Sequence, residues 1–198
     1  VPVAFAIGLS CLATFAVEGL PFETAIQMMT SGMNVFSFLA IPFFIFSGEL
    51  MLHGGIADKI VDFARSLVGH WKGGLGLANV LASTLFGGVS GSPVADTSAM
   101  GGVMIPIMKR EGYSAAYAVN VTTHASLVGA LMPTSHNMII YALAAGGSVS
   151  IGALITAGLL PAAVLMGCML VAAYLVAVKR GYPAGVFPGW AGVARAAV

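Results

Sequence analysis

Charged side chains are scarce in this sequence, and they are unevenly placed. The 198 residues include 8 Lys or Arg and 7 Asp or Glu, together 8% of the chain. A soluble globular domain carries about 25% charged residues, so a water-soluble globule is excluded. Stretches without any charge are typical of membrane spans, and there are four: 1–17, 24–48, 73–95 and 112–178.

Strong net charge and cysteine are also lacking. The net charge of +1 leaves no basic surface and no acidic tail, so we expect no nucleic-acid partner. Cys11 and Cys168 both lie inside apolar runs, and neither has a CxxC partner or a nearby pair of histidines. The sequence therefore indicates no disulfide framework and no cysteine–histidine metal site.

Apolar residues, glycine and proline are abundant instead. Hydrophobic residues make up 59% of the chain, which also contains 26 Gly and 9 Pro. This composition predicts an all-α polytopic membrane protein whose transmembrane helices are closely packed or broken. The expected spans are 1–17, 33–52, 114–132 with a continuation at 138–145, and 150–178.

The most charged segment, 53–72, is predicted to form an amphipathic helix. Ile56, Ile60, Phe63 and Leu67 fall on one helical stripe, and the charged residues lie mostly off it. Such a helix either lies in the membrane interface or packs under the bundle.

The positions of Lys and Arg predict the orientation of the chain in the membrane. These residues occur in 53–74, in 109–113 and from 179 onward, which places those segments in the cytoplasm. The loops at 18–32 and 146–150 contain neither residue and are expected outside.

The segment 75–108 therefore leaves the cytoplasm and returns to it, yet its two apolar arms are short. The arms 75–90 and 99–108 reach roughly 24 and 15 Å, less than the hydrocarbon core of about 30 Å. We expect a re-entrant helical hairpin whose tip, 90–98, lies near mid-depth, where non-helical backbone must be buried in protein or line a cavity. Two full crossings are the alternative interpretation.

The hairpin tip reads GGVSGSPVADTS (87–98). Gly88 and Gly91 permit a tight backbone there. Pro93 suits the first turn of the returning helix, because its fixed φ is compatible with a helix start.

Asp96 falls in the same turn and has two interpretations. A carboxylate near a helix N-terminus caps the helix and interacts favourably with its dipole. Alternatively the tip encloses a small cation, with oxygen ligands from the Ser90 and Ser92 hydroxyls, exposed carbonyls and Asp96. Both interpretations stay open at this point.

A second break is predicted at GALMPTSHN (129–137). Pro133 removes one backbone N–H and displaces the carbonyl of Gly129, which unwinds the helix at mid-span. No single helical face can hide the four polar side chains that follow: Thr134, Ser135, His136 and Asn137. Two interrupted segments with polar tips are the pattern of an ion-coupled transporter, in which half-helix N-termini face an anionic substrate and unwound carbonyls bind Na⁺.

Two other functions fit parts of this pattern. An intramembrane hydrolase or transferase would use Asp96, His124 and His136, but the sequence contains no GxSxG, HExxH or paired-Asp motif. A passive channel is the other alternative. His124 follows two threonines on a predicted transmembrane helix, which favours an interhelical hydrogen bond over ligation. We therefore predict a transporter, without catalytic residues.

Three segments closely resemble the large membrane subunit of TRAP transporters, the tripartite ATP-independent periplasmic transporters. They are IPFFIFSGELMLHGGIADKIVDFARSLVGH (41–70), GGVSGSPVADTSAMGGVMIPIMKREGYSAAYA (87–118) and AAGGSVSIGALITAGLLPA (144–162). The resemblance covers nearly the whole chain. It implies an elevator-type secondary transporter, multi-pass in the bacterial inner membrane, driven by Na⁺ as coupling ion and without another cofactor.

The same resemblance implies the partners and substrates. The partners in the lipid bilayer and outside it are a small four-helix membrane subunit and a soluble periplasmic substrate-binding protein. The substrates are organic acids such as C4-dicarboxylates, sialic acid and other sugar acids.

Roles for individual residues also follow from the resemblance. The family's first sodium-site region and the broken helix that completes it match seven positions here: Ser90, Gly91, Ser92, Asp96, Gly129, Met132 and Thr134. The substrate is expected beside six: Ser92, Pro93, Thr134, Ser135, His136 and Asn137. Many family members read close to GPIIPPS where this chain has GALMPTSHN, so His136 and Asn137 either alter the substrate pocket or mark a subfamily.

The family subunit is longer than this chain and consists of two inverted repeats, whereas this chain contains one hairpin and one broken helix. We therefore expect the chain to be the first repeat. Its expected parts are a scaffold-like part at 1–74, a transport part at 75–149, a transmembrane helix at 150–180 and the start of a cytoplasmic connection at 181–198.

Overall fold

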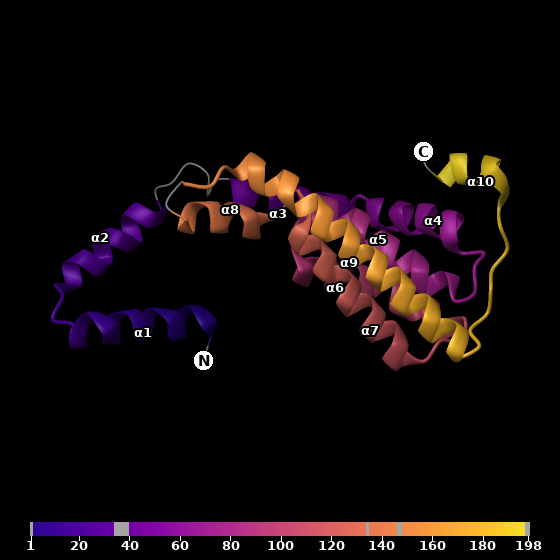
Figure 1. The fold of residues 1–198 in the computed structure, drawn as a ribbon, viewed down its shortest axis with the longest axis horizontal. Coiled ribbons are helices and arrows are strands. Elements are labelled where there is room, and N and C mark those ends of the chain that lie inside the picture. The colour runs from indigo at the N-terminus through magenta and orange to yellow at the C-terminus, as the bar shows by residue number, and fades with distance from the viewer. Residues whose placement is uncertain (1, 34–39, 134, 146–147, 197–198) are drawn as a thin grey trace. The chain divides into compact units, whose positions relative to one another are not determined.

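A computed structural model describes residues 2–33, 40–133, 135–145 and 148–196 of the chain. The chain divides into two units, Val1–Ala40 and Ile41–Val198. The first unit contains two helices, α1 (Val3–Val17) and α2 (Phe22–Met33), which carry the indigo colours in Figure 1. The first half of the span predicted at 33–52 includes 34–39, which lie outside the described residues.

The loop expected at 18–32 is a short turn followed by a helix, so the prediction is wrong there. Gly19 adopts a φ of +67°, a left-handed conformation that glycine tolerates, and α2 begins soon after at Phe22. Pro21 suits the start of a helix, and its carbonyl accepts a hydrogen bond from Thr24 N at 3.0 Å. The polar residues of this segment therefore lie on a helix that the proline initiates.

The second unit is a bundle of helices. In Figure 1, α5, α6, α7 and α9 lie side by side, α4 runs along α5, and α10 lies beside α4. The helices of this unit have the bounds α3 Ala40–His53, α4 Ile56–Val68, α5 Gly74–Ser90, α6 Pro93–Arg110, α7 Ala115–Ser126, the 3₁₀ helix η2 Leu127–Leu131, α8 His136–Ala144, α9 Ile151–Lys179 and α10 Gly189–Ala196.

α9 is long and apolar enough to cross a membrane, and no other helix in the described part of the chain meets both conditions. Its 29 residues give a length of about 43 Å, and Pro161 lies inside the helix without ending it. The helix predicted at 150–178 is therefore confirmed. α1 and α5 are shorter apolar helices.

α5 and α6 form a helical hairpin. α5 ends at Ser90, Gly91 turns the chain with a φ of +60°, and Pro93 begins α6. The roles predicted for Gly91 and Pro93 are confirmed, whereas Gly88 lies inside α5 rather than in the turn. With 17 and 18 residues, the arms measure about 26 and 27 Å, so the returning arm is longer than predicted and both are shorter than about 30 Å.

Three stretches of helix present a straight stripe of residues to a common seam at the centre of this unit. Residues three or four apart lie on one face of a helix, so the spacing alone aligns each stripe. α5 contributes an Asn, a Ser and a Gly, α7 with η2 contributes a Thr, a Ser and a Gly, and α6 contributes an Asp and three Met. All of them are buried: Asn79, Ser83, Gly87, Thr122, Ser126, Gly129, Asp96, Met100, Met104 and Met108.

The helix that begins with α7 breaks earlier than its proline predicts. The α-helical pattern ends at Ser126, η2 follows, and Met132 is extended with φ −74° and ψ 156°, all before Pro133. The carbonyl of Gly129 is not left without a partner, because it accepts a hydrogen bond from Met132 N at 3.3 Å. A tighter 3₁₀ segment is common at helix ends, and here it brings Gly129 against α5.

α4 packs against α5, which agrees with one of the two positions predicted for the amphipathic segment. The buried side chains, however, are Ala57, Val61 and Ala64, while Ile56 is exposed and Ile60 is only partly buried. The buried face of α4 therefore lies beside the stripe of larger apolar residues that the sequence predicts. Small side chains allow two helix backbones to approach closely, which agrees with the packing of α4 against α5.

The base of the hairpin, where α5 begins and α6 ends, is tied to the segment after α9. The Tyr182 ring stacks on Tyr113 with 4.3 Å between ring centroids, and its hydroxyl accepts a hydrogen bond from Ser114 N at 3.2 Å. Arg180 donates to the Ser114 hydroxyl at 2.8 Å. These contacts join the start of α7 to the end of α9.

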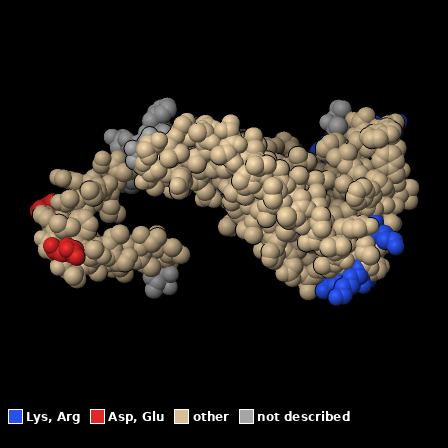
Figure 2. Space-filling view, viewed as in Figure 1, with Lys and Arg blue, Asp and Glu red and all other residues tan. Residues whose placement is uncertain are grey.

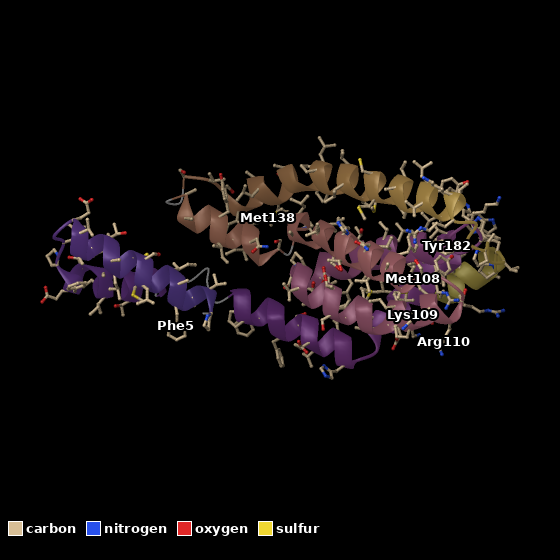
Figure 3. The ribbon with its side chains drawn as sticks, turned by 90° about the horizontal axis from the view of Figure 1, so that it is seen from below. Phe5, Met108, Lys109, Arg110, Met138 and Tyr182 are labelled. Carbon is tan, nitrogen blue, oxygen red and sulfur yellow. The ribbon has the colours of Figure 1, made fainter. Side chains whose placement is uncertain are left out.

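Charge gathers at this end of the second unit. Figure 3 shows Lys109, Arg110 and Tyr182 at the end near Met108, while Met138 lies toward the other end. On the face drawn in Figure 2, Lys and Arg also lie at this end. The distribution agrees with the predicted orientation, which stays a prediction.

The contact between α4 and α5 predicts a packing effect at Ala64, which is 0% exposed. Ala64→Leu inserts a larger side chain into a filled core and is expected to lower the free energy of unfolding by about 1–3 kcal/mol. Thermal unfolding of the purified full-length protein in detergent measures this. Lys59→Leu, at an exposed position of the same helix, is the control and is expected to change stability by less than about 0.5 kcal/mol. Equal effects of the two substitutions would contradict the observed register.

Candidate functional site

Asp96 lies in the first turn of α6 with a side chain that is 0% exposed. Its Oδ1 accepts a hydrogen bond from the Ser90 hydroxyl, and the Ser90 Oγ accepts one from Ser92 N at 3.2 Å. Ser92 is the N-cap of α6, because its Oγ accepts a hydrogen bond from Ala95 N at 3.4 Å. Ser92 therefore supplies the cap that was considered for Asp96, and the Asp96 carboxylate is enclosed by the protein.

Two glycines make room for this carboxylate. A Cβ atom on Gly87 would lie 2.6 Å from Gly129 Cα and 2.8 Å from Asp96 Oδ2. A Cβ atom on Gly129 would lie 3.2 Å from Gly87 Cα and would also collide with Asp96 Oδ2. Separations under 3.0 Å essentially never occur for real Cβ atoms. The backbones of α5 and η2 thus meet directly around the side chain from α6.

The Asp96 carboxylate lacks a compensating charge within the described part of the chain. The two ion pairs found there join His53 to Glu49 and Arg65 to Glu111, so neither includes Asp96. Asp96 Oδ2 is buried and has no hydrogen-bond partner among the described residues. Because a buried ionised carboxylate is unstable without a partner, this side chain requires either a proton or a cation.

The C-terminal parts of α5 and η2 meet beside Asp96, because Gly87 and Gly129 approach each other there. Gly91 N donates to Gly87 O at 2.9 Å at the end of α5, and Met132 N donates to Gly129 O at the end of η2. The C-terminal end of a helix is the negative end of its dipole. Two such ends near Asp96 add to the negative potential of its carboxylate. The Met132 side chain borders this region, because a Cβ on Gly88 would lie 3.1 Å from Met132 Cε.

The structure brings most of the predicted cation-site residues together. Hydrogen bonds, chain turns and backbone contacts link six of them: Ser90, Gly91, Ser92, Asp96, Gly129 and Met132. Thr134, the seventh, lies outside the described residues.

The polar residues after Pro133 divide by exposure. Ser135 is 1% exposed, and its hydroxyl has no hydrogen-bond partner among the described residues. Asn137, at the second position of α8, is exposed. The side chain of His136, like residue Thr134, lies outside the described part of the structure. Ser135 is thus an inward-facing polar group at the N-terminal end of α8.

The residues considered for an enzyme do not form a catalytic group within the described part of the chain. His124 is exposed, and its Nδ1 lies 2.8 Å from Asn120 O in the same helix. Within the described part of the chain, His124 therefore bonds inside its own helix rather than to another helix. No hydrogen bond or ion pair between described residues joins His124 to Asp96.

Sequence reasoning missed the glycine that completes the site and the polar residues below it. From the sequence we assign a tight backbone to Gly88 and no role to Gly87. Asn79 and Ser83 lie in the arm predicted as apolar, 75–90, and Thr122 is identified only as a neighbour of His124. The available signal was the four-residue spacing of 79, 83 and 87, which places polar and small residues on one helical face.

Comparison with known proteins assigns a family. The family described as "Tripartite ATP-independent periplasmic transporter, DctM component" matches residues 1–198. An uncharacterised protein named YgiK from Salmonella typhimurium is 43% identical over 92% of this chain and 42% of its own length.

Two further relatives carry functional names. The C4-dicarboxylate TRAP transporter large permease protein DctM of Rhodobacter capsulatus is 37% identical over 92% of this chain and 44% of its own length. The sialic acid TRAP transporter large permease protein SiaM of Vibrio cholerae is 38% identical over 91% of this chain and 42% of its own length. The chain therefore spans less than half the length of these curated relatives.

The contact between Gly87 and Gly129 predicts that neither position accepts a side chain. Gly129→Ala is expected to lower the free energy of unfolding by about 1–3 kcal/mol, because its Cβ collides with Asp96 Oδ2. Thermal unfolding of the full-length protein in detergent tests this. The matched control is Gly102→Ala on the exposed side of α6, where a Cβ meets no atom within 4 Å and stability is expected to stay equal or rise. A Gly129→Ala protein as stable as the control variant would disprove the close approach.

Proposed function

The chain belongs to the DctM component family of tripartite ATP-independent periplasmic transporters, and from this premise we propose that it forms part of a Na⁺-coupled importer of a small organic acid. The family comprises transporters rather than enzymes. Transport of an organic acid by this protein is our inference from the relatives and from the site around Asp96.

The enclosed carboxylate of Asp96 is the observation that carries the sodium proposal. A cation beside it satisfies both the buried charge and the unpartnered Oδ2. Hydroxyl, carboxylate and carbonyl oxygens are the ligands that hard cations prefer, and Ser90, Ser92 and the ends of α5 and η2 offer them. A proton is the alternative partner for this carboxylate.

The proposed position of the substrate rests on two helix N-termini. α6 begins at Ser92 and Pro93, and α8 begins just after Ser135, with an inward-facing hydroxyl. Free N–H groups and the positive dipole end at such termini favour a carboxylate. We therefore place the organic acid beside Ser92, Pro93 and Ser135, and keep Thr134, His136 and Asn137 as predicted contacts. C4-dicarboxylates and sialic acid, the substrates in the names of two relatives, are the first compounds to test.

Ser92 connects the two proposed sites. Its backbone N–H contacts the Ser90 hydroxyl that binds Asp96, while its side chain forms the cap of α6. Cation binding that orders Ser90 and Asp96 therefore also fixes the N-terminus offered to the substrate. By linkage, each ligand then raises the affinity for the other, which couples sodium entry to import.

The proposed setting is the inner membrane of a bacterium. There the chain is multi-pass, with α5 and α6 as a re-entrant hairpin and the charged hairpin base on the cytoplasmic side. A small membrane subunit and a periplasmic substrate-binding protein complete the assembly, and a second, inverted repeat completes the substrate site. An elevator-type movement of the hairpin and broken helix is the proposed transport step.

Sodium titration of uptake tests this function. The full-length protein is expressed with its small subunit and binding protein, and uptake of radiolabelled succinate and of sialic acid is followed. We expect at least one of the two to be imported with strong sodium dependence. Asp96→Asn and Ser92→Ala are each expected to raise the sodium concentration for half-maximal uptake by about tenfold or more, because each removes part of the cation site.

Asp58→Asn, the same substitution at an exposed position of α4, is the matched control and is expected to behave as wild type. Unchanged sodium dependence in both Asp96→Asn and Ser92→Ala would overturn the assigned site. Uptake by the wild type that ignores sodium, or that follows only a proton gradient, would overturn the proposed coupling.

A further inference from the structure

We propose that the hydrogen bond between Asn79 and Thr122 is a positioning contact that sets the sodium affinity of the hairpin tip without touching the ion. The inference rests on the proposed function, because it names a second determinant of the same site. It concerns the other end of the central seam from Asp96.

This contact belongs to a fully buried polar cluster. Asn79 Nδ2 donates to Thr122 Oγ1 at 2.7 Å and lies 3.6 Å from Met108 Sδ. Asn79 Oδ1 accepts a hydrogen bond from the Ser83 hydroxyl at 3.3 Å. Asn79, Thr122, Ser83 and Met108 are each 0% exposed. One amide therefore joins α5 to α7 and α6, with both its donor and its acceptor group used.

Two helical stripes connect this cluster to the hairpin tip, one on α5 and one on α7 with η2. On α5, Asn79 lies eight residues before Gly87, which corresponds to about 12 Å along the helix. On the facing side, Thr122 lies seven residues before Gly129 in η2. Fixing Asn79 to Thr122 therefore fixes the axial and rotational position of α5 against the segment that carries Gly129.

The tip has very little tolerance for a change of this position. Gly87 and Gly129 approach so closely that no Cβ fits between them, and both border Asp96 Oδ2. A small shift of α5 along or around its axis would separate these backbones and move the carbonyl end of α5 relative to Asp96. Sodium affinity depends on the spacing of several oxygen ligands, so it responds to such a shift.

A pair of apolar side chains in place of Asn79 and Thr122 would not fix the position of α5 against α7 as sharply. Three buried methionines pack along the seam on α6, and methionine adapts readily to different packing arrangements. A buried amide instead loses its hydrogen bonds as soon as the register changes, which makes the correct register the favoured one. Asn79 is thus the directional contact in a seam that is otherwise adaptable.

A double-mutant cycle on sodium-dependent uptake tests the proposal in the full-length assembly. Thr122→Val keeps the shape of the side chain and removes the hydroxyl, and Asn79→Leu removes the amide. Each is expected to raise the sodium concentration for half-maximal uptake by about threefold to tenfold. The double variant is expected to be no worse than the poorer single variant, because both changes break one contact.

Two controls separate positioning from a general loss of folded protein. Thr122→Ser retains the hydroxyl and is expected to keep wild-type sodium affinity, while Thr123→Val makes the Thr122→Val change at the adjacent exposed residue and is expected to be neutral. A loss of folded protein lowers the maximal rate per cell but leaves the half-maximal sodium concentration unchanged.

The outcomes distinguish this inference from the proposed function. A sodium-dependent wild type combined with unshifted half-maximal sodium in Thr122→Val and Asn79→Leu overturns the positioning role alone. Additive effects of the two substitutions also overturn it. A wild type without sodium dependence overturns the proposed function itself.

Discussion

The burial of one carboxylate is the constraint on which the rest of this structure depends. Asp96 is removed from solvent at the first turn of α6, and its Oδ2 has no hydrogen-bond partner among the described residues. The space for it exists only because Gly87 and Gly129 lack side chains. The close packing of α5, α6 and η2 and the requirement of Asp96 for a proton or a cation are therefore two aspects of one arrangement.

The central seam connects this arrangement to the remainder of the second unit. At the hairpin tip, the seam encloses Asp96 between the backbones of α5 and η2, and toward the hairpin base it holds the amide of Asn79 between α5, α6 and α7. The stacked rings of Tyr113 and Tyr182 lie at the hairpin base, together with its charged residues. The seam therefore contains buried polar groups at both of its ends, and the basic residues of α6 and α9 gather at the hairpin base.

The sequence predicted the hairpin better than the broken helix, and the reasons are physical. Gly91 and Pro93 act locally, through backbone conformations that each residue type favours, so the turn could be placed from the sequence. The change from α7 to η2 occurs where Gly129 meets Gly87, which is a contact between segments distant in the chain. The buried face of α4 likewise depends on its packing against another helix, and this packing buries Ala64 while the larger Ile56 stays exposed.

The central claim is that the enclosed Asp96 carboxylate forms part of a sodium site, and equilibrium binding of ²²Na⁺ tests it most directly. The measurement uses the purified full-length protein in detergent, without organic acid or binding protein, so that transport steps do not contribute. The account predicts saturable binding by the wild type and by Asp58→Asn, and strongly weakened binding by Asp96→Asn. Equal ²²Na⁺ binding by the wild type and by Asp96→Asn would contradict it.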